Sequence, residues 1–189
     1  MNNQDNAARK NYRPRLSFFH ANGKGTGCAL VLELIPACGN DEGCVMAKIA
    51  NQLTIGDRSG PNPVYPRFDW ENSIGLKLGF NDLSKMLQVF RGECESLEDG
   101  KGLYHRSAKW TTRICLRHVV EPLAGYSLEV YRNSSASRDE GRAHFLVSPH
   151  EAVGLAAALE SSFGVLCFGV PEYLAARSNA VGEARDAAA

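Results

Sequence analysis

Residues 99–122, DGKGLYHRSAKWTTRICLRHVVEP, contain an alternation that predicts a β-strand with one apolar and one cationic face. Successive side chains of a strand point to opposite sides of a sheet. One side carries Trp110, Thr112, Ile114, Leu116 and Val120, and the other carries Lys109, Thr111, Arg113, Cys115 and Arg117. Regularly spaced arginines fit a linear anion such as a nucleic-acid backbone, although solvent-facing strand positions also carry Lys and Arg for solubility alone.

The chain has 189 residues, 44% of them apolar, and a formal net charge of zero. This size and composition predict one globular domain. We assign residues 13–170 to it, and we expect disordered segments at 1–12 and 171–189. Zero net charge argues against a protein that coats nucleic acid indiscriminately, because such proteins are usually basic overall. The acidic residues gather in short runs at expected turns and helix ends, which leaves the strands with basic faces.

The sequence favours a cytoplasmic, bacterial protein. No apolar run approaches the length that spans a bilayer, so we expect no membrane contact, and the amide-rich N-terminus lacks the pattern of a secretion signal. The six cysteines form no C-x-x-C pair and suit buried thiols in a reducing compartment. The His and Cys residues lack metal-ligand spacing. We therefore expect no metal and no cofactor.

The periodicity of the sequence changes twice from a strand pattern to a helix pattern. Residues 13–20, 28–35, 44–55 and 73–80 predict strands, after which Leu83, Met86, Leu87 and Phe90 recur at helical spacing. Residues 103–106, 110–121, 126–132 and 142–147 predict four more strands, and the capping-box sequence Ser148-Pro149-His150-Glu151 then starts a second helix. Because no helix separates consecutive strands, we predict an α+β fold of two antiparallel four-stranded sheets, each followed by a helix.

The apolar stripes of the two helices are large for a small domain. They include Leu87, Phe90, Leu155, Leu159 and Phe163. These side chains either pack on the chain's own sheets or also bury against further copies of the chain. We therefore expect a homo-oligomer with these residues at its interface.

Proteins that bind single-stranded nucleic acid on a sheet combine aromatic side chains, which stack on bases, with cations that contact phosphates. The candidates of both kinds are Arg15, Phe18 or Phe19, His20, Lys24, Lys48, Trp70, Lys77, Lys109, Arg113, Arg117 and Tyr131. Trp110 shares a face with Ile114 and Leu116, so we assign it to the core. The glycine-rich residues 22–27 around Lys24 lead into a strand, so they do not form a Walker loop.

An enzymatic function finds little support in the sequence. Ser, His and Asp residues occur, but no strand-to-helix nucleophile elbow does, and the five histidines are scattered along the chain. We predict a protein without catalytic residues.

Four short segments follow one another in an order that carries a family resemblance: Phe68-Asp69-Trp70, Glu93-Cys94-Glu95, Lys101-Gly102 and Val120-Glu121-Pro122-Leu123. In these segments the chain resembles the Whirly family of single-stranded-DNA-binding proteins, over about residues 23–168. Mitochondrial guide-RNA-binding proteins and coactivators of the positive-cofactor-four type share this style of sheet and helix.

The resemblance implies two antiparallel four-stranded sheets and a four-fold symmetric tetramer held by the helices. It also implies that single-stranded DNA lies across sheet edges between subunits, with little sequence preference. The family's Lys-Gly-Lys-Ala-Ala-Leu signature would fall on residues 23–30, where one lysine is missing and glycines are inserted.

We therefore predict a non-enzymatic, oligomeric protein that binds single-stranded DNA through sheet faces, by base stacking and phosphate contacts and largely independently of sequence. Three alternatives stay open. The first is RNA binding or strand annealing on the same surface, the second is an oligomeric scaffold whose sheets bind protein, and the third is a small-molecule enzyme that uses the glycine-lysine loop.

Overall fold

Glycine- and proline-rich turns divide the first part of the chain into the strands of one antiparallel sheet. β1 (Arg15–His20), β2 (Cys28–Ile35), β3 (Cys44–Thr54) and β5 (Ile74–Leu78) lie in the order β1–β2–β3–β5. The two-residue β4 (Arg67–Phe68) pairs with the end of β3, beyond the segment that β5 covers. Prolines in residues 57–66 keep most of this connection out of the sheet, because proline lacks the N–H that a ladder needs.

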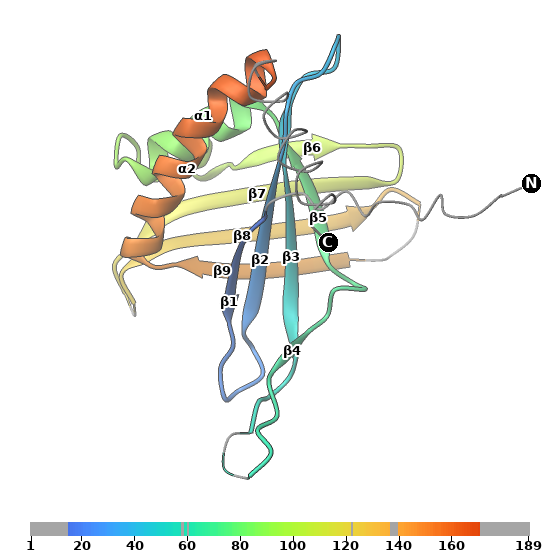
Figure 1. The fold of residues 1–189 in the computed structure, drawn as a ribbon, viewed down its shortest axis with the longest axis vertical. Helices are drawn as coiled ribbons and strands as arrows, with labels where there is room; N and C mark the ends of the chain where they lie inside the picture. The colour runs from blue at the N-terminus through green and yellow to red at the C-terminus, as the bar shows by residue number, and fades with distance from the viewer. Residues whose placement is uncertain (1–14, 58, 60, 122, 137–139, 171–189) are drawn as a thin grey trace, which may run out of the picture.

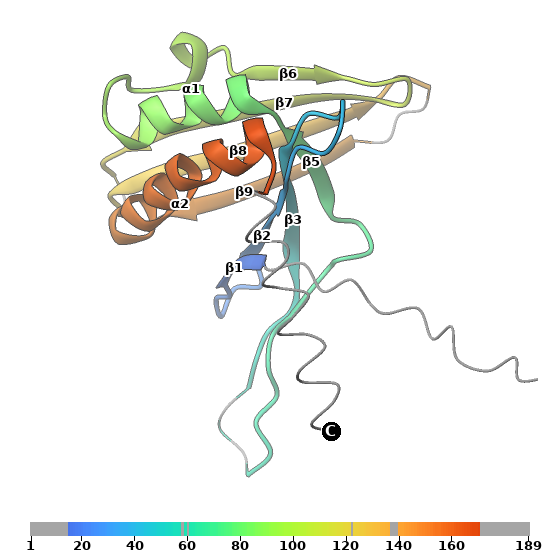
Figure 2. The same ribbon diagram turned by 45° about the horizontal axis from the view of Figure 1, so that its top comes forward.

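The second sheet is a meander of four antiparallel strands. They are β6 (Leu103–Arg106), β7 (Trp110–Val119), β8 (Gly125–Ser134) and β9 (Glu140–Val147), hydrogen-bonded in that order. The two sheets run across each other, and both helices lie beside the first sheet on one face of the second (Figures 1 and 2). The predicted α+β fold of two antiparallel sheets followed by helices is confirmed.

This arrangement comes from a computed structural model that describes residues 15–57, 59, 61–121, 123–136 and 140–170. The segments 1–12 and 171–189, which we expect to be disordered, lie outside the described residues.

Both helices begin where an acidic side chain accepts a backbone hydrogen bond from the residue before the helix. In α1 (Phe80–Phe90), Asp82 accepts from the N–H of Gly79 at 3.0 Å. In α2 (Pro149–Phe168), Glu151 accepts from the N–H of Ser148 at 2.9 Å, with proline in the first turn as the sequence predicts. These bonds satisfy N–H groups that a helix start leaves without partners. A short 3-10 helix (Leu97–Gly100) connects α1 to β6.

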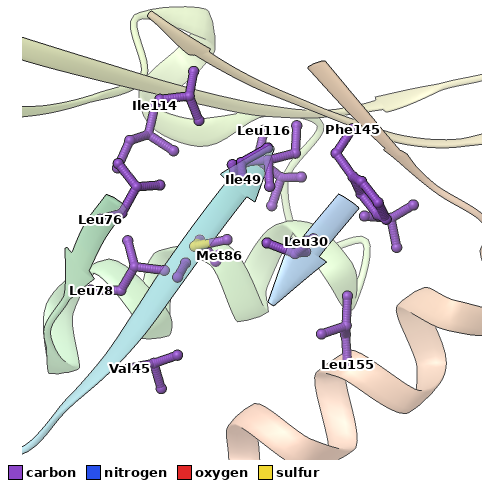
Figure 3. Close-up of a cluster of buried hydrophobic side chains, with 14 of the residues drawn as sticks. Leu30, Val45, Ile49, Leu76, Leu78, Met86, Ile114, Leu116, Phe145 and Leu155 are labelled. Carbon is purple, nitrogen blue, oxygen red and sulfur yellow. The ribbon is translucent and has the colours of Figure 1, made fainter. Parts of the chain in front are cut away.

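The inner faces of the two sheets and one side of each helix enclose a shared apolar core. Figure 3 shows Ile49 and Leu76 of the first sheet packed toward Ile114 of the second, with Met86 of α1 and Leu155 of α2 closing the cluster. All of these side chains are buried. The alternating pattern of each strand therefore has one apolar side because that side faces this core.

The helix residues that we expected at an oligomer interface face this chain's own core. Leu87, Phe90, Leu155 and Leu159 are buried within the single chain. Phe163 is half-buried, and its ring centroid lies 5.1 Å from that of Phe80. Of the two alternatives left open by the sequence, packing on the chain's own sheets accounts for these side chains.

The opposite side of α2 is exposed and apolar. Val153 and Phe168 are large and exposed, and small exposed residues lie between them on the same side: Ala157, Ser161 and Gly164. By length and composition alone this 20-residue helix could cross a membrane, which differs from our sequence expectation that no segment is long and apolar enough. In the folded chain its other side packs against β2, β8 and α1, so α2 serves as a core helix here.

All six cysteines are free thiols. Burial raises the pKa of Cys28 to about 11, an effect that its hydrogen bond to the backbone of Ala29 only partly offsets. Cys28 therefore stays a neutral, small core side chain at physiological pH.

An ion pair joins α1 to the edge of the second sheet. Asp82, which caps α1, lies 3.2 Å from Nε2 of His105 on β6. Burial disfavours the ionised form of Asp82, but the hydrogen bonds from His105 and from Gly79 outweigh burial and lower the pKa of the carboxyl. The hydrogen bond to Asp82 raises the pKa of His105 despite partial burial of the ring.

We predict that this pair makes the protein more stable at mildly acidic pH. Folding raises the pKa of His105, so the pair stabilises the folded state in full at pH values below the unfolded pKa of about 6.5. This stabilisation is lost as the pH rises through the pKa of His105 in the folded state. Asp82 stays ionised because its folded pKa is lowered. Thermal unfolding of wild type and His105→Gln should show a larger Tm difference at about pH 5.5 than at about pH 8. An equal difference at both pH values would contradict the prediction.

Candidate nucleic-acid interface

The register of the first sheet sets polar residues in rows on its outer face, the side away from the core. One row across β1, β2, β3 and β5 contains Arg15, Glu33, Met46 and Lys77. The next row contains Ser17, Val31, Lys48 and Gly75. Arg15, Lys48 and Lys77 are exposed, so this face presents separate cations above a partly apolar floor.

An aromatic cluster, consisting of exposed Phe19 and Trp70 and half-buried Phe68, lies beside these rows, with Phe19 in the next row along β1. The ring centroid of Phe19 lies 5.7 Å from that of Phe68 and 6.5 Å from that of Trp70. Phe19 is 57% exposed and Trp70 is 39% exposed. Clustered aromatic rings that stay open to solvent mark a surface suited to stacking against a ligand.

Backbone pairing and a side-chain turn hold the aromatic cluster in place. Phe68 pairs with Gln52 of β3. The carboxylate of Asp69 accepts from the backbone N–H of Asn72 at 3.2 Å and from its side-chain amide at 2.9 Å. The same hydrogen bonds lower the pKa of Asp69. Trp70 lies inside this turn, so its ring projects from a fixed backbone.

Phe19 and Trp70 form a wall shared by two hollows. The first hollow, of about 400 Å³, is also lined by Arg15, Ser17, Val31, Glu33, Met46 and Lys48. The second hollow, of about 640 Å³, is also lined by Ala21, Tyr65, Pro66, Arg67 and Phe68. Sites for small organic groups occupy roughly 300–1,000 Å³. Each hollow therefore has room for a nucleobase.

The loop that carries Lys24 is fixed by the buried side chain of Gln52. Oε1 of Gln52 accepts from the N–H groups of Asn22 at 2.9 Å and Gly27 at 3.1 Å. Its Nε2 donates to the carbonyls of Asn22 and Thr54, both at 3.0 Å. The side chain of Asn22 accepts from the N–H of Lys24 at 3.0 Å. The loop follows Ala21, which lines the second hollow.

We predict that Gly27→Ala destabilises the protein while Gly23→Ala does not. A Cβ at residue 27 would lie 2.2 Å from the carbonyl oxygen of His20 and 2.3 Å from Oε1 of Gln52, so the backbone or the Gln52 side chain would have to shift. The free energy of unfolding, measured by urea denaturation, should fall by about 1–3 kcal/mol. At residue 23 nothing lies within 4 Å of an added Cβ, so Gly23→Ala should leave the free energy of unfolding unchanged. An equal decrease in both variants would contradict the prediction that close contacts at Gly27 fix the loop.

The outer face of the second sheet also carries a row of aromatic and cationic side chains. Across β6, β7, β8 and β9 the row contains Tyr104, Arg113, Tyr131 and Arg142. The guanidinium of Arg113 lies 5.8 Å from the ring centroid of Tyr104 and donates to the carbonyls of Lys101 at 2.8 Å and Gly100 at 3.0 Å. Arg113 is therefore already bound by the backbone next to it.

Glu129 organises the rest of this outer face. Its side chain is 14% exposed and accepts hydrogen bonds from Arg117 and Arg142, each at 3.2 Å, and from the hydroxyl of Tyr131. The hydrogen bond from Tyr131 is the main reason that the pKa of Glu129 is lowered; burial opposes it and Arg142 adds to it. A phosphate would have to compete with this carboxylate for both arginines.

The structure distributes the sequence-predicted site residues over two surfaces. Arg15, Lys48, Trp70 and Lys77 reach the outer face of the first sheet, and Arg113, Arg117 and Tyr131 reach that of the second. The two outer faces point away from each other, because both inner faces line the shared core. Lys109 lies apart from both groups, with Nζ 5.3 Å from the ring centroid of Trp110, which is half-buried.

Phe18 and His20 lie on the inner side of β1, facing the core, so the structure does not bring them to either outer face. The ring of Phe18 packs edge-on against Phe145, with centroids 6.2 Å apart. The ring of His20 stacks on Phe145 at 4.4 Å, and its Nε2 lies 2.7 Å from the carboxylate of Glu151. Both side chains are half-buried, and that of His20 is 36% exposed, but their ring contacts are with the core residue Phe145.

Strand parity identifies the aromatic residue of β1 that belongs to the outer face. Arg15 and Phe19 are four residues apart and share a side, whereas Arg15 and Phe18 are three apart and cannot. Sequence reasoning also missed Phe68, Tyr104 and Glu129. Phe68 entered the sequence analysis only in the segment Phe68-Asp69-Trp70 that carries the family resemblance. No periodic pattern assigns Phe68 or Glu129 to a site, because their contacts are with partners from distant strands.

The fold has counterparts among solved structures, although no protein-family model and no curated protein matches the sequence. WHY1 from Arabidopsis thaliana matches with a TM-score of 0.66 at 13% identity, over 92% of this chain and 93% of that chain. The fold is that of the Whirly proteins. The plant transcriptional regulator PBF-2 has the same Whirly fold, with a TM-score of 0.61 at 15% identity over 82% of each chain.

A guide-RNA-binding protein complex, in its structure bound to a guide RNA, shares the Whirly fold more distantly. Its TM-score is 0.51 at 14% identity, over 82% of this chain and 93% of that chain. At these identities the likeness concerns the fold, and the sequence resemblance to the Whirly family is confirmed at that level.

Proposed function

We propose that this chain binds single-stranded nucleic acid across the outer face of its first sheet. The observation that carries the proposal is the aromatic cluster of Phe19, Phe68 and Trp70, in which Phe19 and Trp70 are exposed, beside separate exposed cations. Aromatic rings stack on unpaired bases, and cations such as Lys48 contact the phosphates that connect them. A duplex hides the faces of its bases, so this surface favours a single strand.

Single-stranded DNA is the ligand that we propose first, bound with little dependence on sequence. The Whirly fold supports this choice through the family resemblance in the sequence. RNA is the second candidate, and it is supported by the guide-RNA-bound structure that shares the fold. Stacking and phosphate contacts serve both, because they do not read the sugar.

We propose a binding function without catalysis. In the part of the chain that the structure describes, no group of three His, Cys, Asp or Glu side chains could hold a metal ion. Two of the structural neighbours are a plant transcriptional regulator and a guide-RNA-binding protein complex. A binding role for this chain agrees with both.

We also propose that the chain forms a homo-oligomer, with a tetramer expected from the family resemblance, through the exposed side of α2. Its small residues, among them Ala157 and Ser161, allow a second helix to approach closely, and Val153 and Phe168 supply apolar area. This surface replaces the buried Leu155 and Leu159 as the proposed contact.

The first test is fluorescence anisotropy of a labelled single-stranded DNA titrated with the full chain, repeated with duplex DNA and with RNA of the same sequence. We expect salt-sensitive binding to single strands and little binding to the duplex. Lys48→Ala should reduce the slope of log affinity against log salt by about 0.7, the value of one phosphate contact to a single strand. Absence of binding at low salt would contradict the proposal and favour a protein-binding scaffold.

The second test separates the two outer faces. We predict that Phe19→Ala and Trp70→Ala each weaken single-strand binding by about 1–3 kcal/mol, because each removes a stacking platform. Tyr104→Ala removes an exposed ring from the second sheet and should leave the affinity unchanged. Loss of binding in Tyr104→Ala, with normal binding in the other two variants, would move the site to the second sheet.

The third test concerns assembly. Ala157→Glu places a charge on the exposed side of α2 and should convert the oligomer to monomers, as measured by light scattering after size-exclusion chromatography. Gln88→Glu introduces the same charge on the exposed side of α1 and serves as the matched control. An unchanged mass in Ala157→Glu would exclude this side of α2 from the interface.

A further inference from the structure

We propose that a bound single strand continues past the edge of the first sheet onto a second platform, where Lys109 and Arg132, both packed against Trp110, contact its phosphates. This platform lies on the inner side of the second sheet, at the end that extends past β5. The inference rests on the proposed function and deepens it, because it assigns the path of the strand beyond the first sheet and a role to Lys109.

The outer face of the first sheet and the inner face of the second point in the same direction, because the inner faces of both sheets meet in the shared core. β7 and β8 extend past β5 on the side away from the helices (Figures 1 and 2). Trp110 and Arg132 share strand parity with the core residues Ile114 and Val130, so they lie on this inner side. Trp110, which we expected in the core, is half-buried there, as is Arg132. A ligand on the outer face of the first sheet can therefore reach both residues by crossing β5.

The row of Lys48 on the first sheet leads directly to this platform. Lys48 pairs across the strands with Gly75 of β5. The carbonyl of Gly75 accepts a hydrogen bond from Nη2 of Arg132 at 2.6 Å. Gly75 is exposed, and nothing lies within 4 Å of an added Cβ at this residue. The edge strand is therefore low and open at the point that separates a cation of the first sheet from a cation of the second.

Trp110 positions two cations beside each other. Cζ of Arg132 and Nζ of Lys109 each lie 5.3 Å from the centroid of its ring. Among the residues that the structure describes, no carboxylate pairs with either cation, and burial alone lowers the pKa of Arg132, with no acidic neighbour to offset it. A cation–π contact orients a cation but leaves its charge in place. The platform therefore offers two positive charges to an anionic ligand.

The arginines on the outer face of the second sheet differ in this respect. Arg117 and Arg142 each lie 3.2 Å from the carboxylate of Glu129. A phosphate that bound there would have to replace this carboxylate, whereas a phosphate on the platform would add a partner. We therefore expect the strand to cross β5 toward Trp110 and not to continue around the molecule to the opposite outer face.

A purely structural or long-range role for the platform makes a different prediction. If Arg132 and Lys109 only secure the crossing of the two sheets, replacing Lys109 leaves binding unchanged. If their charge attracts nucleic acid from a distance, the replacement weakens binding of every oligonucleotide alike. If the strand crosses β5, the effect appears only with oligonucleotides long enough to reach the platform. The dependence on length is therefore the measurement that separates these roles.

The experiment uses the full chain and labelled oligothymidines of about 4 to about 16 nucleotides, the range of site sizes of single-strand-binding domains. For each length, fluorescence anisotropy gives the slope of log affinity against log salt. With the longest oligonucleotides Lys109→Gln should reduce this slope by about 0.7, the value of one phosphate contact to a single strand. With the shortest, which the first sheet binds alone, the slope should keep its wild-type value. Arg132→Gln should behave in the same way.

Three control variants complete the design. Lys109→Arg keeps the charge and should keep the wild-type slope at every length. Arg106→Gln removes an exposed charge from the outer side of the same end of the sheet and should have no effect at any length. Lys48→Ala removes a contact on the first sheet and should reduce the slope at every length.

The outcomes distinguish failure of this inference from failure of the proposed function. A slope in Lys109→Gln that is unchanged at every length, or reduced equally at every length, would overturn the inference and leave the proposed function standing. Arg132→Gln also removes the hydrogen bond to Gly75, so the exposed Lys109 decides the result if that variant is unstable. Absence of binding by wild type at low salt would overturn the proposed function and this inference with it.

Discussion

Burial of the inner faces of both sheets in one core is the constraint on which the rest of this structure depends. Phe145 and Ile114 of the second sheet and Ile49 of the first sheet are fully buried. Burying each such side chain contributes about 1.5–3 kcal/mol. A slip of one residue in any strand would turn these side chains to solvent, so the pairing register is strongly specified. The positions of the outer-face cations follow from that register, although they contribute nothing to the core themselves.

A few polar side chains then fix the parts that the apolar core does not reach. Gln52 is the clearest case, because its buried amide binds the loop of Lys24 while its backbone pairs with Phe68. Removing a partner from such a buried network would leave polar groups without hydrogen bonds, at a cost of about 1–3 kcal/mol each. Asp82 plays a similar role between α1 and His105. The loop beside the aromatic cluster is thus fixed by hydrogen bonds from the buried side chain of Gln52.

Hydrophobic periodicity predicted the order of strands and helices, because each strand and each helix buries one apolar side in the core. Alternation placed Ile114 and Leu116 in the core, and the helical spacing of Leu83 and Met86 predicted α1. The same periodicity does not say what an apolar stripe packs against, and Leu155 faces the chain's own sheets instead of another copy.

The candidate site was harder to predict because it depends on contacts between distant segments. The parity of β1 separates Phe19 from Phe18, and parity is a local property that the sequence contains. The aromatic cluster also needs Phe68, which reaches Phe19 through a two-residue strand that pairs at the far end of β3. A segment of two residues has no periodicity to detect. Likewise, nothing near Arg113 in the sequence indicates that the backbone carbonyl of Gly100 accepts its hydrogen bond.

The zero net charge of the chain does not describe the charge of each outer face. Each face carries a glutamate among arginines, but the environments differ. Glu129 is 14% exposed and is surrounded by Arg117, Arg142 and Tyr131, so its charge is used within the sheet. Glu33 lines an open hollow beside an exposed aromatic wall, and its side chain is 21% exposed. Separate exposed cations such as Lys48 and Lys77 remain on the outer face of the first sheet, so a balanced net charge is compatible with binding an anionic strand.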